Sequence, residues 1–167
     1  KIENRDSFPA SHPADKHQIG IRTMTRALDG MQKEAIVNDS FTGTAWRMVC
    51  DEGPWLNGTD LSSFPLGFFS TGMIASFASE IMALARRRNI DIQGLKIIQD
   101  ARYSMEGSAV KRTMAGTALP IETEVTINSD SAKSELEKLV YHALAASPAD
   151  AIMRDKLPSQ FKISLNG

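Results

Sequence analysis

The organisation of this chain follows from one segment, residues 64–88, FPLGFFSTGMIASFASEIMALARRR. Between Pro65 and Ala85 it carries a single charged residue, Glu80, and it is apolar or small on every side. A helix that lacks a polar face either lies in a large core or spans a membrane. Serines before the proline and arginines in the last turn suit the free backbone groups at the two ends of a helix. We therefore predict one long central helix, around which the other elements pack.

The length of this segment would allow it to cross a bilayer, since about 20 apolar residues suffice. Glu80 and the hydroxyl groups of Ser70, Thr71, Ser76 and Ser79 count against a span, and the mean hydropathy of the chain is -0.22. We therefore expect a buried helix of a soluble protein and no membrane partner.

The chain has 167 residues, a net charge of -1 and one cysteine, Cys50. This length suits one domain with a sizeable core, and the near-neutral charge argues against a nucleic-acid partner. A single cysteine excludes a disulfide framework, a cysteine-rich metal site and a two-cysteine redox cycle within one chain. No secretory leader is visible, so we expect a cytoplasmic location by default, although the chain begins with Lys1.

Residues 1–18 show no hydrophobic periodicity, so we predict a loose arm followed by a single domain over residues 19–167. His12 and His17 lie on this arm with Asp15 between them. A metal site needs three or four converging ligands. We expect these histidines to be solvated, and we predict no metal site.

The first part of the domain is typical of three strands. Residues 19–27 and 31–38 flank Asp29-Gly30, a dipeptide that favours a hairpin with a type I′ turn, because both central positions of that turn need positive φ. Residues 44–51 alternate as a third strand.

The third strand places Cys50 on its core face and Arg47 on the opposite face. Asp51 and Glu52 follow the cysteine and would oppose a thiolate. We expect Cys50 to be a small core residue and Arg47 to be solvated or available to the site.

The later part of the chain predicts strands, helices and a final strand. These elements are expected at residues 95–103 (strand), 119–128 (strand), 131–146 (helix), 149–156 (short helix) and 161–165 (strand). The longer helix is amphipathic, and Asp130 is its expected N-cap. Residues 104–116 are expected to form a polar connection.

Two segments carry a resemblance to a known family. They are GTDLSSFPLGFFSTGMIASFASEIMALARRRNI at residues 58–90 and SELEKLVYHALAASPADAIMRDKLPSQFKISL at residues 134–165. With the order of the elements, these segments resemble the OsmC/Ohr family of bacterial organic-hydroperoxide reductases, over about residues 19–165. The resemblance implies an α+β fold with antiparallel sheets around a long buried central helix, in an intertwined homodimer.

The family's chemistry uses a peroxidatic cysteine on the central helix and a resolving cysteine before the proline of the second helix, with an arginine and a glutamate that activate the first thiol. Counted from Pro65, the peroxidatic position falls on Ser76, and the resolving position falls on Ser147. The position of the glutamate falls on Leu66 or Gly67. The resemblance therefore implies the family's fold without its two thiols.

A serine hydroxyl cannot be oxidised to a sulfenic acid and then captured by a second thiol. We therefore predict a non-redox protein with no cofactor, which binds a small apolar or amphipathic ligand at the dimer interface or is purely structural. The alternative is a hydroperoxide reductase that uses Cys50 with an external thiol.

Further candidates surround the two serines. Phe69 and Met73 are candidate pocket residues, and Glu80 is either one half of an ion pair, with Arg47 the candidate partner in the dimer, or a functional acid. A hydrolytic role for Ser76 would need His142 as a base, and no G-x-S-x-G elbow is present. We expect no serine catalysis.

Overall fold

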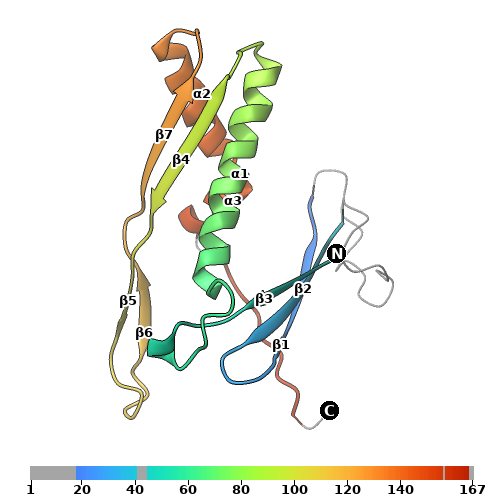
Figure 1. Ribbon diagram of the computed structural model, residues 1–167, viewed down its shortest axis with the longest axis vertical. Coiled ribbons are helices and arrows are strands. Elements are labelled where there is room, and N and C mark those ends of the chain that lie inside the picture. Colours follow the sequence, from blue (N-terminus) through green and yellow to red (C-terminus); the bar gives the residue numbers. More distant parts are fainter. Residues whose placement is uncertain (1–17, 41–44, 156, 166–167) are drawn as a thin grey trace. The chain divides into compact units, whose positions relative to one another are not determined.

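The computed structural model describes residues 18–40, 45–155 and 157–165, and the chain divides into two compact units, Lys1–Phe69 and Ser70–Gly167 (Figure 1). The central helix begins in the first unit and continues into the second. The arm with His12 and His17 lies outside the described residues, apart from its last position. That residues 19–167 form a single domain stays a prediction.

The first unit contains an antiparallel sheet with the order β1-β2-β3. Its strands are β1 (Ile21–Ala27), β2 (Lys33–Asp39) and β3 (Ala45–Cys50), and a 3-10 turn, η1 (Pro54–Leu56), follows. The predicted hairpin is present, but the type I′ turn is wrong. Gly30 has a φ of 53°, whereas neither Asp29 nor Met31 has a positive φ, and the Gln32 N–H donates to the Asp29 carbonyl at 2.9 Å. The turn is therefore centred one residue later than predicted.

The predicted core face of β3 is not covered within the described residues. Trp46 and Met48 are exposed and Cys50 is partly exposed, whereas the buried residue of this strand is Ala45. Alternation along a strand identifies its two faces but not which of them another element covers.

The second unit combines two antiparallel strand pairs with helices. Its strands are β4 (Gly94–Asp100), β5 (Tyr103–Glu106), β6 (Ala115–Ala118) and β7 (Glu122–Asn128), and its later helices are α2 (Lys133–Ala146) and α3 (Pro148–Arg154). β4 pairs with β7 in the register Leu95↔Ile127 and Ile97↔Val125. The β5–β6 pair lies where a polar connection was predicted, so that prediction is wrong. Nearly all residues of this hairpin are exposed, and therefore no apolar period marks it.

The predicted strand at residues 161–165 is also wrong for the single chain. Residues 157–165 pair with no strand among the described residues, and Phe161, Ile163 and Leu165 are exposed. An alternating segment becomes a strand only where an edge accepts its backbone hydrogen bonds.

The central helix α1 (Pro65–Arg87) matches the predicted segment. Its buried residues, Met73, Phe77, Ile81 and Ala85, are spaced by four and form one stripe. The rest of its surface is not buried in the single chain, so burial on every side is not observed there. By length and composition alone, α1 is the one helix in the described part of the chain that would be able to cross a membrane.

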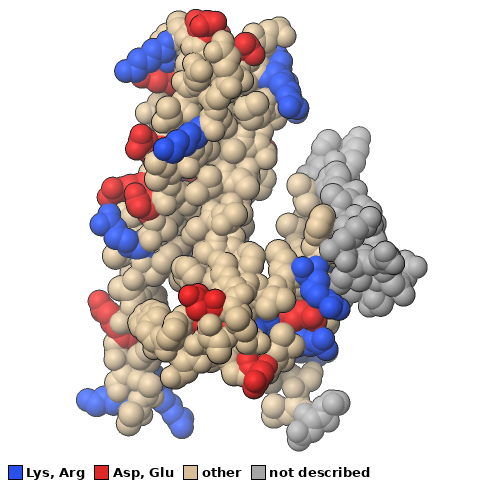
Figure 2. Space-filling view, viewed as in Figure 1, with Lys and Arg blue, Asp and Glu red and all other residues tan. Residues whose placement is uncertain are grey.

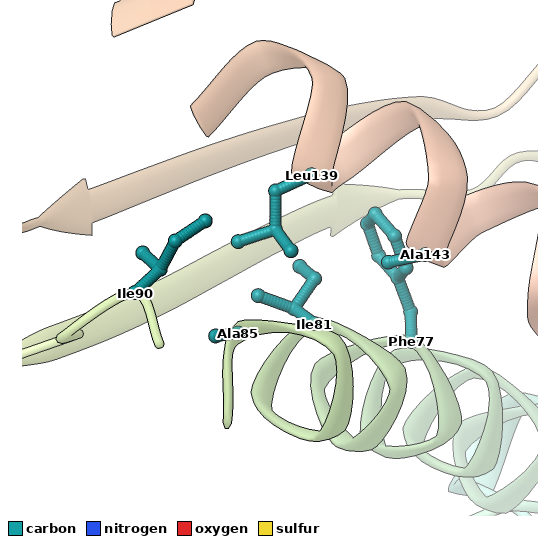
Figure 3. Packing of buried hydrophobic residues seen from close by; sticks show 6 residues of the cluster. All are labelled: Phe77, Ile81, Ala85, Ile90, Leu139 and Ala143. Carbon is teal, nitrogen blue, oxygen red and sulfur yellow. The ribbon is translucent and has the colours of Figure 1, made fainter. Parts of the chain in front are cut away.

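Three residues of this stripe, Phe77, Ile81 and Ala85, form the core of the second unit with residues of α2 (Figure 3). Ile81 faces Leu139 and Phe77 lies beside Ala143, and each of these four side chains is buried. Partly buried residues on alternate positions of β4 and β7 pack against the same cluster: Leu95, Ile97, Val125 and Ile127. The inner face of this strand pair therefore covers the helices.

The ends of the helices show how local sequence fixes them. Asn89 has a φ of 56°, and the Ile90 N–H donates to the Ala85 carbonyl at 2.9 Å, which closes α1 as predicted from its basic, asparagine-tipped end. Asp130 is not the cap of α2, because that helix starts later, with Ala132 at the N-cap. Asp130 instead accepts a hydrogen bond from Gln93 Nε2 at 3.3 Å.

Candidate functional site

The hydroxyl groups of Ser76 and Ser147 lie together. Their Oγ atoms are 3.2 Å apart, although the residues are far apart in sequence. Ser76 is partly buried on α1, and Ser147 is buried between α2 and α3. That these are the positions of the family's two cysteines stays a prediction.

Local structure fixes Ser147 at this place. The residue before a proline is held out of the helical region, and Ser147 has φ −71° and ψ 117° ahead of Pro148. It therefore ends α2 and caps α3, and its Oγ accepts the Asp150 N–H at 3.4 Å. The cap leaves the hydroxyl of Ser147 directed at Ser76.

An open pocket of about 780 Å³, here called the Ser147 pocket, lies within the second unit. Most of its lining is apolar, including Met73 and Phe77 from α1 and Leu144 from α2. Its polar lining residues are Gln99, Thr123, Tyr141, Ser147 and Asp150. A largely apolar pocket with a few polar groups is the usual form of a small-molecule site.

Gln99 is the functional candidate that the sequence analysis missed. It follows Leu95 and Ile97 on the inward positions of β4, and its Nε2 donates to Thr123 Oγ1 at 3.3 Å across the strand pair. Its Oε1 is buried without a hydrogen-bond partner in the described ranges. The sequence does show that Gln99 falls on the same alternating face as the apolar Leu95 and Ile97, and this pattern could have identified it.

The other predicted site residues divide between the two units. Met73 lines the Ser147 pocket, whereas Phe69 does not and belongs to the first unit. Glu80 is half-buried and forms no ion pair with a described residue. Arg47 pairs with Glu34, with Nε 3.2 Å from Oε2. The Arg47–Glu80 pair across a dimer stays a prediction.

Glu34 is a buried charged residue that the sequence did not single out. It accepts Arg26 Nε at 3.0 Å as well as Arg47, and both arginine side chains are more than half exposed. The strand register places these three side chains on one face of the sheet. The buried carboxylate is therefore paired twice within its own unit.

The geometry gives no support to serine hydrolysis. His142 Nδ1 lies 2.6 Å from Arg88 Nη2, about three helical turns beyond Ser76 along α1. Among the described residues, the hydroxyl of Ser76 is hydrogen-bonded to that of Ser147 and to no base. A nucleophilic serine needs a base within hydrogen-bond reach.

Asp51 is fully buried and organises a loop over residues 51–61, here called the Asp51 loop. Its carboxylate accepts the Glu52 N–H at 2.8 Å, the Thr59 N–H at 3.1 Å, the Thr59 hydroxyl at 2.6 Å and the Leu61 N–H at 3.3 Å. The Thr59 hydroxyl is the main cause that lowers the pKa of Asp51 from 3.8 to about 2, and burial opposes it. Each hydrogen bond holds the loop that leads into α1.

No family model matches this sequence, and no curated protein matches it. Solved structures do. An OsmC-like hydroperoxide resistance protein from Jannaschia sp. ccs1 superposes with a TM-score of 0.58 at 14% identity, over 89% of this chain and 95% of that one. The organic hydroperoxide resistance protein OsmC of Legionella pneumophila gives 0.57 at 18%, over 80% and 89%.

A third similar structure is an organic hydroperoxide resistance protein of Vibrio cholerae O1 biovar eltor, which holds captopril in one of its active sites. It superposes with a TM-score of 0.51 at 14% identity, over 87% of this chain and 90% of that one. Together with the elements above, these likenesses define an α+β protein built on small antiparallel sheets and a long helix. Its fold is the OsmC-like fold, as the sequence predicted.

Proposed function

We propose that this OsmC-like protein binds a small apolar or amphipathic molecule in the Ser147 pocket and does not reduce hydroperoxides with a thiol pair. The observation that carries this function is the contact of 3.2 Å between Ser76 Oγ and Ser147 Oγ, of which Ser147 lines the pocket and Ser76 does not. Two hydroxyl groups face each other where the resemblance expects two thiols. In this proposal the chain keeps a pocket beside these positions but lacks the two thiols that peroxide reduction requires.

The chemical reason is the difference between sulfur and oxygen. Thiol peroxidases cleave the O–O bond by attack of a thiolate, which becomes a sulfenic acid that a second thiol then reduces. A serine has no corresponding oxidation step. Cys50 is the only thiol, and it belongs to the other unit.

A small organic ligand is supported by two features. The lining of the pocket is mostly apolar, which favours the burial of a hydrocarbon group. The similar Vibrio cholerae protein holds captopril in an active site, so a site on this fold accepts a small organic molecule.

We also propose a homodimer, with the ligand close to the interface. In the single chain, Trp46, Phe64 and Phe68 are exposed, as are Phe161 and Ile163 of the unpaired C-terminal segment. On the face drawn in Figure 2, acidic and basic residues are interspersed between wide uncharged areas. Apolar exposure on this scale favours an obligate interface.

The test of the redox half is hydroperoxide consumption. Cumene hydroperoxide with dithiothreitol should disappear no faster with the protein than without it, and Cys50→Ser should change nothing. Cys50 is partly exposed, and this supports the alternative of a one-cysteine peroxidase. If the protein consumes hydroperoxide and Cys50→Ser abolishes the activity, the alternative is correct.

The test of the binding half is the fluorescence of N-phenyl-1-naphthylamine, an uncharged apolar probe. It should bind with saturation, and Thr123→Phe should weaken binding because Thr123 lines the pocket. Thr126→Phe is the matched control, because Thr126 lies on the same strand outside that lining. Equal binding by both variants would place the probe elsewhere and reject the proposed site.

A further inference from the structure

The lining of the Ser147 pocket includes an acidic residue but no basic residue of the described ranges. No lysine, arginine or histidine of the described ranges lines it, and Asp150 is its one charged lining residue. Arg154 pairs with Asp150, at 2.5 Å from Nε to Oδ2, but does not itself line the pocket. A buried anion needs a cation or several hydrogen-bond donors. A ligand carboxylate in this pocket would meet no cation among the described lining residues, and the adjacent Arg154 is already paired with Asp150.

The uncharged polar groups favour a ligand that donates hydrogen bonds. Gln99 Nε2 is engaged by Thr123, whereas Gln99 Oε1 has no partner among the described residues. If the amide were turned over, its N–H groups would lack a partner instead, and a ligand hydroxyl, which both donates and accepts, would pair with either orientation. Gln99 lines the pocket, and the terminal torsion of glutamine is soft enough for this amide to reorient when a ligand binds.

Ser147 adds a second acceptor. Its Oγ already takes the Asp150 N–H and shares one hydrogen bond with Ser76 Oγ. When Ser147 is the donor in its bond with Ser76, one lone pair of its Oγ is left, and this lone pair and the oxygen of Gln99 both suit a hydroxyl or amide N–H of a ligand. The apolar side chains of Met73 and Phe77 would contact a hydrocarbon tail.

We propose, on the basis of the binding function above, that the Ser147 pocket selects uncharged amphiphiles. The ligand class has an apolar chain and a hydroxyl or amide head group that donates to Gln99 Oε1, and ligands with a carboxylate head group are rejected. Binding of an apolar molecule as such belongs to the function proposed above; selection by the head group is the new element.

The experiment compares decan-1-ol with decanoate at pH 7.5, each below its solubility or micelle limit, by displacement of N-phenyl-1-naphthylamine. The two molecules share one chain length and differ in head group. Decan-1-ol should displace the probe at a concentration roughly tenfold lower or more, because the carboxylate loses its hydration without gaining a cation.

Two variants assign the selection to residues. Gln99→Leu should lower the affinity for decan-1-ol roughly three- to tenfold relative to the affinity for the probe, which is the effect expected from the loss of one hydrogen bond. Asp150→Asn should increase the affinity for decanoate relative to the affinity for decan-1-ol. The matched controls are Gln93→Leu and Asp91→Asn, whose side chains lie outside the pocket lining.

The outcomes separate the two proposals. If the probe binds and decanoate competes as well as decan-1-ol, the selection by head group is wrong and the binding function stands. The same holds if Gln99→Leu affects both ligands equally. If neither the probe nor any decyl ligand binds, the binding function itself fails and the selection falls with it.

Discussion

The Asp51 loop and the Ser147 pocket both bury polar side chains, but they satisfy them differently. Asp51 is fully buried, and its carboxylate receives hydrogen bonds from Glu52, Thr59 and Leu61. Gln99 instead leaves one amide atom unpaired beside an open pocket. Complete pairing within the chain indicates a structural role, and incomplete pairing next to a cavity indicates a place for a ligand. The number of unpaired polar atoms therefore distinguishes the structural loop from the candidate binding pocket, whereas burial alone does not.

The largest expected effect is the loss of the Asp51 loop in Gly58→Ala. A Cβ at Gly58 would overlap the backbone carbonyl of Glu52, and backbone cannot move aside as a flexible side chain does. We expect a destabilisation of about 3–5 kcal/mol, measured as the shift in urea unfolding at fixed protein concentration.

Gly72→Ala is the matched control. Apart from the neighbouring backbone of its own helix, no described residue lies within 4 Å of a Cβ at Gly72, which is in the interior of α1. Alanine should therefore stabilise the protein by about 0.5–1 kcal/mol. Similar stability of the two variants would show that the loop geometry is wrong.

The core behind the pocket gives the next effect. Leu139 is fully buried against Ile81, so Leu139→Ala should cost about 2–5 kcal/mol through lost burial and a residual cavity. Val110→Ala, at an almost fully exposed position, should change stability by less than about 0.5 kcal/mol. Thermal unfolding of both variants at one concentration measures the difference. A small effect at Leu139 would mean that α2 does not pack on α1 as described.

Acid should weaken the Asp51 loop in a defined window. The pKa of Asp51 is lowered from 3.8 to about 2 in the folded protein, so its contribution is complete above 3.8 and is lost as the pH falls to about 2. Stability followed by urea unfolding between pH 6 and pH 2 should therefore fall less steeply in Asp51→Asn than in the unmodified protein. Asp100→Asn, at an exposed position, should keep the steep fall. If stability fell equally with pH in all three proteins, Asp51 would not be a cause of the loss of stability in acid.

The fold was predictable where local sequence sets an element. The apolar composition of residues 64–88 predicted α1, and Ser147-Pro148 predicted the break between α2 and α3. The β5–β6 hairpin was not predictable, because its exposed residues carry no apolar period. Alternation at residues 161–165 could not show that no described strand offers an edge to them.

The site was predictable only in part, for the same reason. The count from Pro65 selected Ser76, and the proline selected Ser147, but both steps depend on the resemblance. Gln99 enters the pocket through the register of β4 with β7, and the partners of Asp51 come from a loop that has no sequence period. Contacts between distant residues decide these roles, and periodicity within one element does not report them.

The smallest expected effects come from replacing the two facing serines by cysteines, which tests whether their side chains can form a disulfide. In a Cys50→Ser background, Ser76→Cys with Ser147→Cys places two thiols where Oγ atoms lie 3.2 Å apart. A disulfide needs about 2.05 Å between sulfurs, which a small rotation of each side chain supplies. We expect a disulfide under mild oxidation, measured by the loss of titratable thiols. Ser79→Cys with Ser147→Cys should stay reduced, because Ser79 is exposed and bonded to the Ala75 carbonyl.

The same double variant should reduce cumene hydroperoxide only weakly. Arg47 is engaged by Glu34, and Leu66 or Gly67 stands where the resemblance expects the activating glutamate. A thiol near its ordinary pKa of about 8.5 is ionised to only a few per cent at pH 7, and the thiolate is the attacking species. The rate should therefore rise with pH as thiolate forms, reach half of its maximum near the pKa of about 8.5 and level off above it. A fast, pH-independent rate at neutral pH would mean that the pocket activates a thiol after all, and that the two serines alone separate this protein from a peroxidase. Failure to form the disulfide would instead show that Ser76 and Ser147 do not face each other.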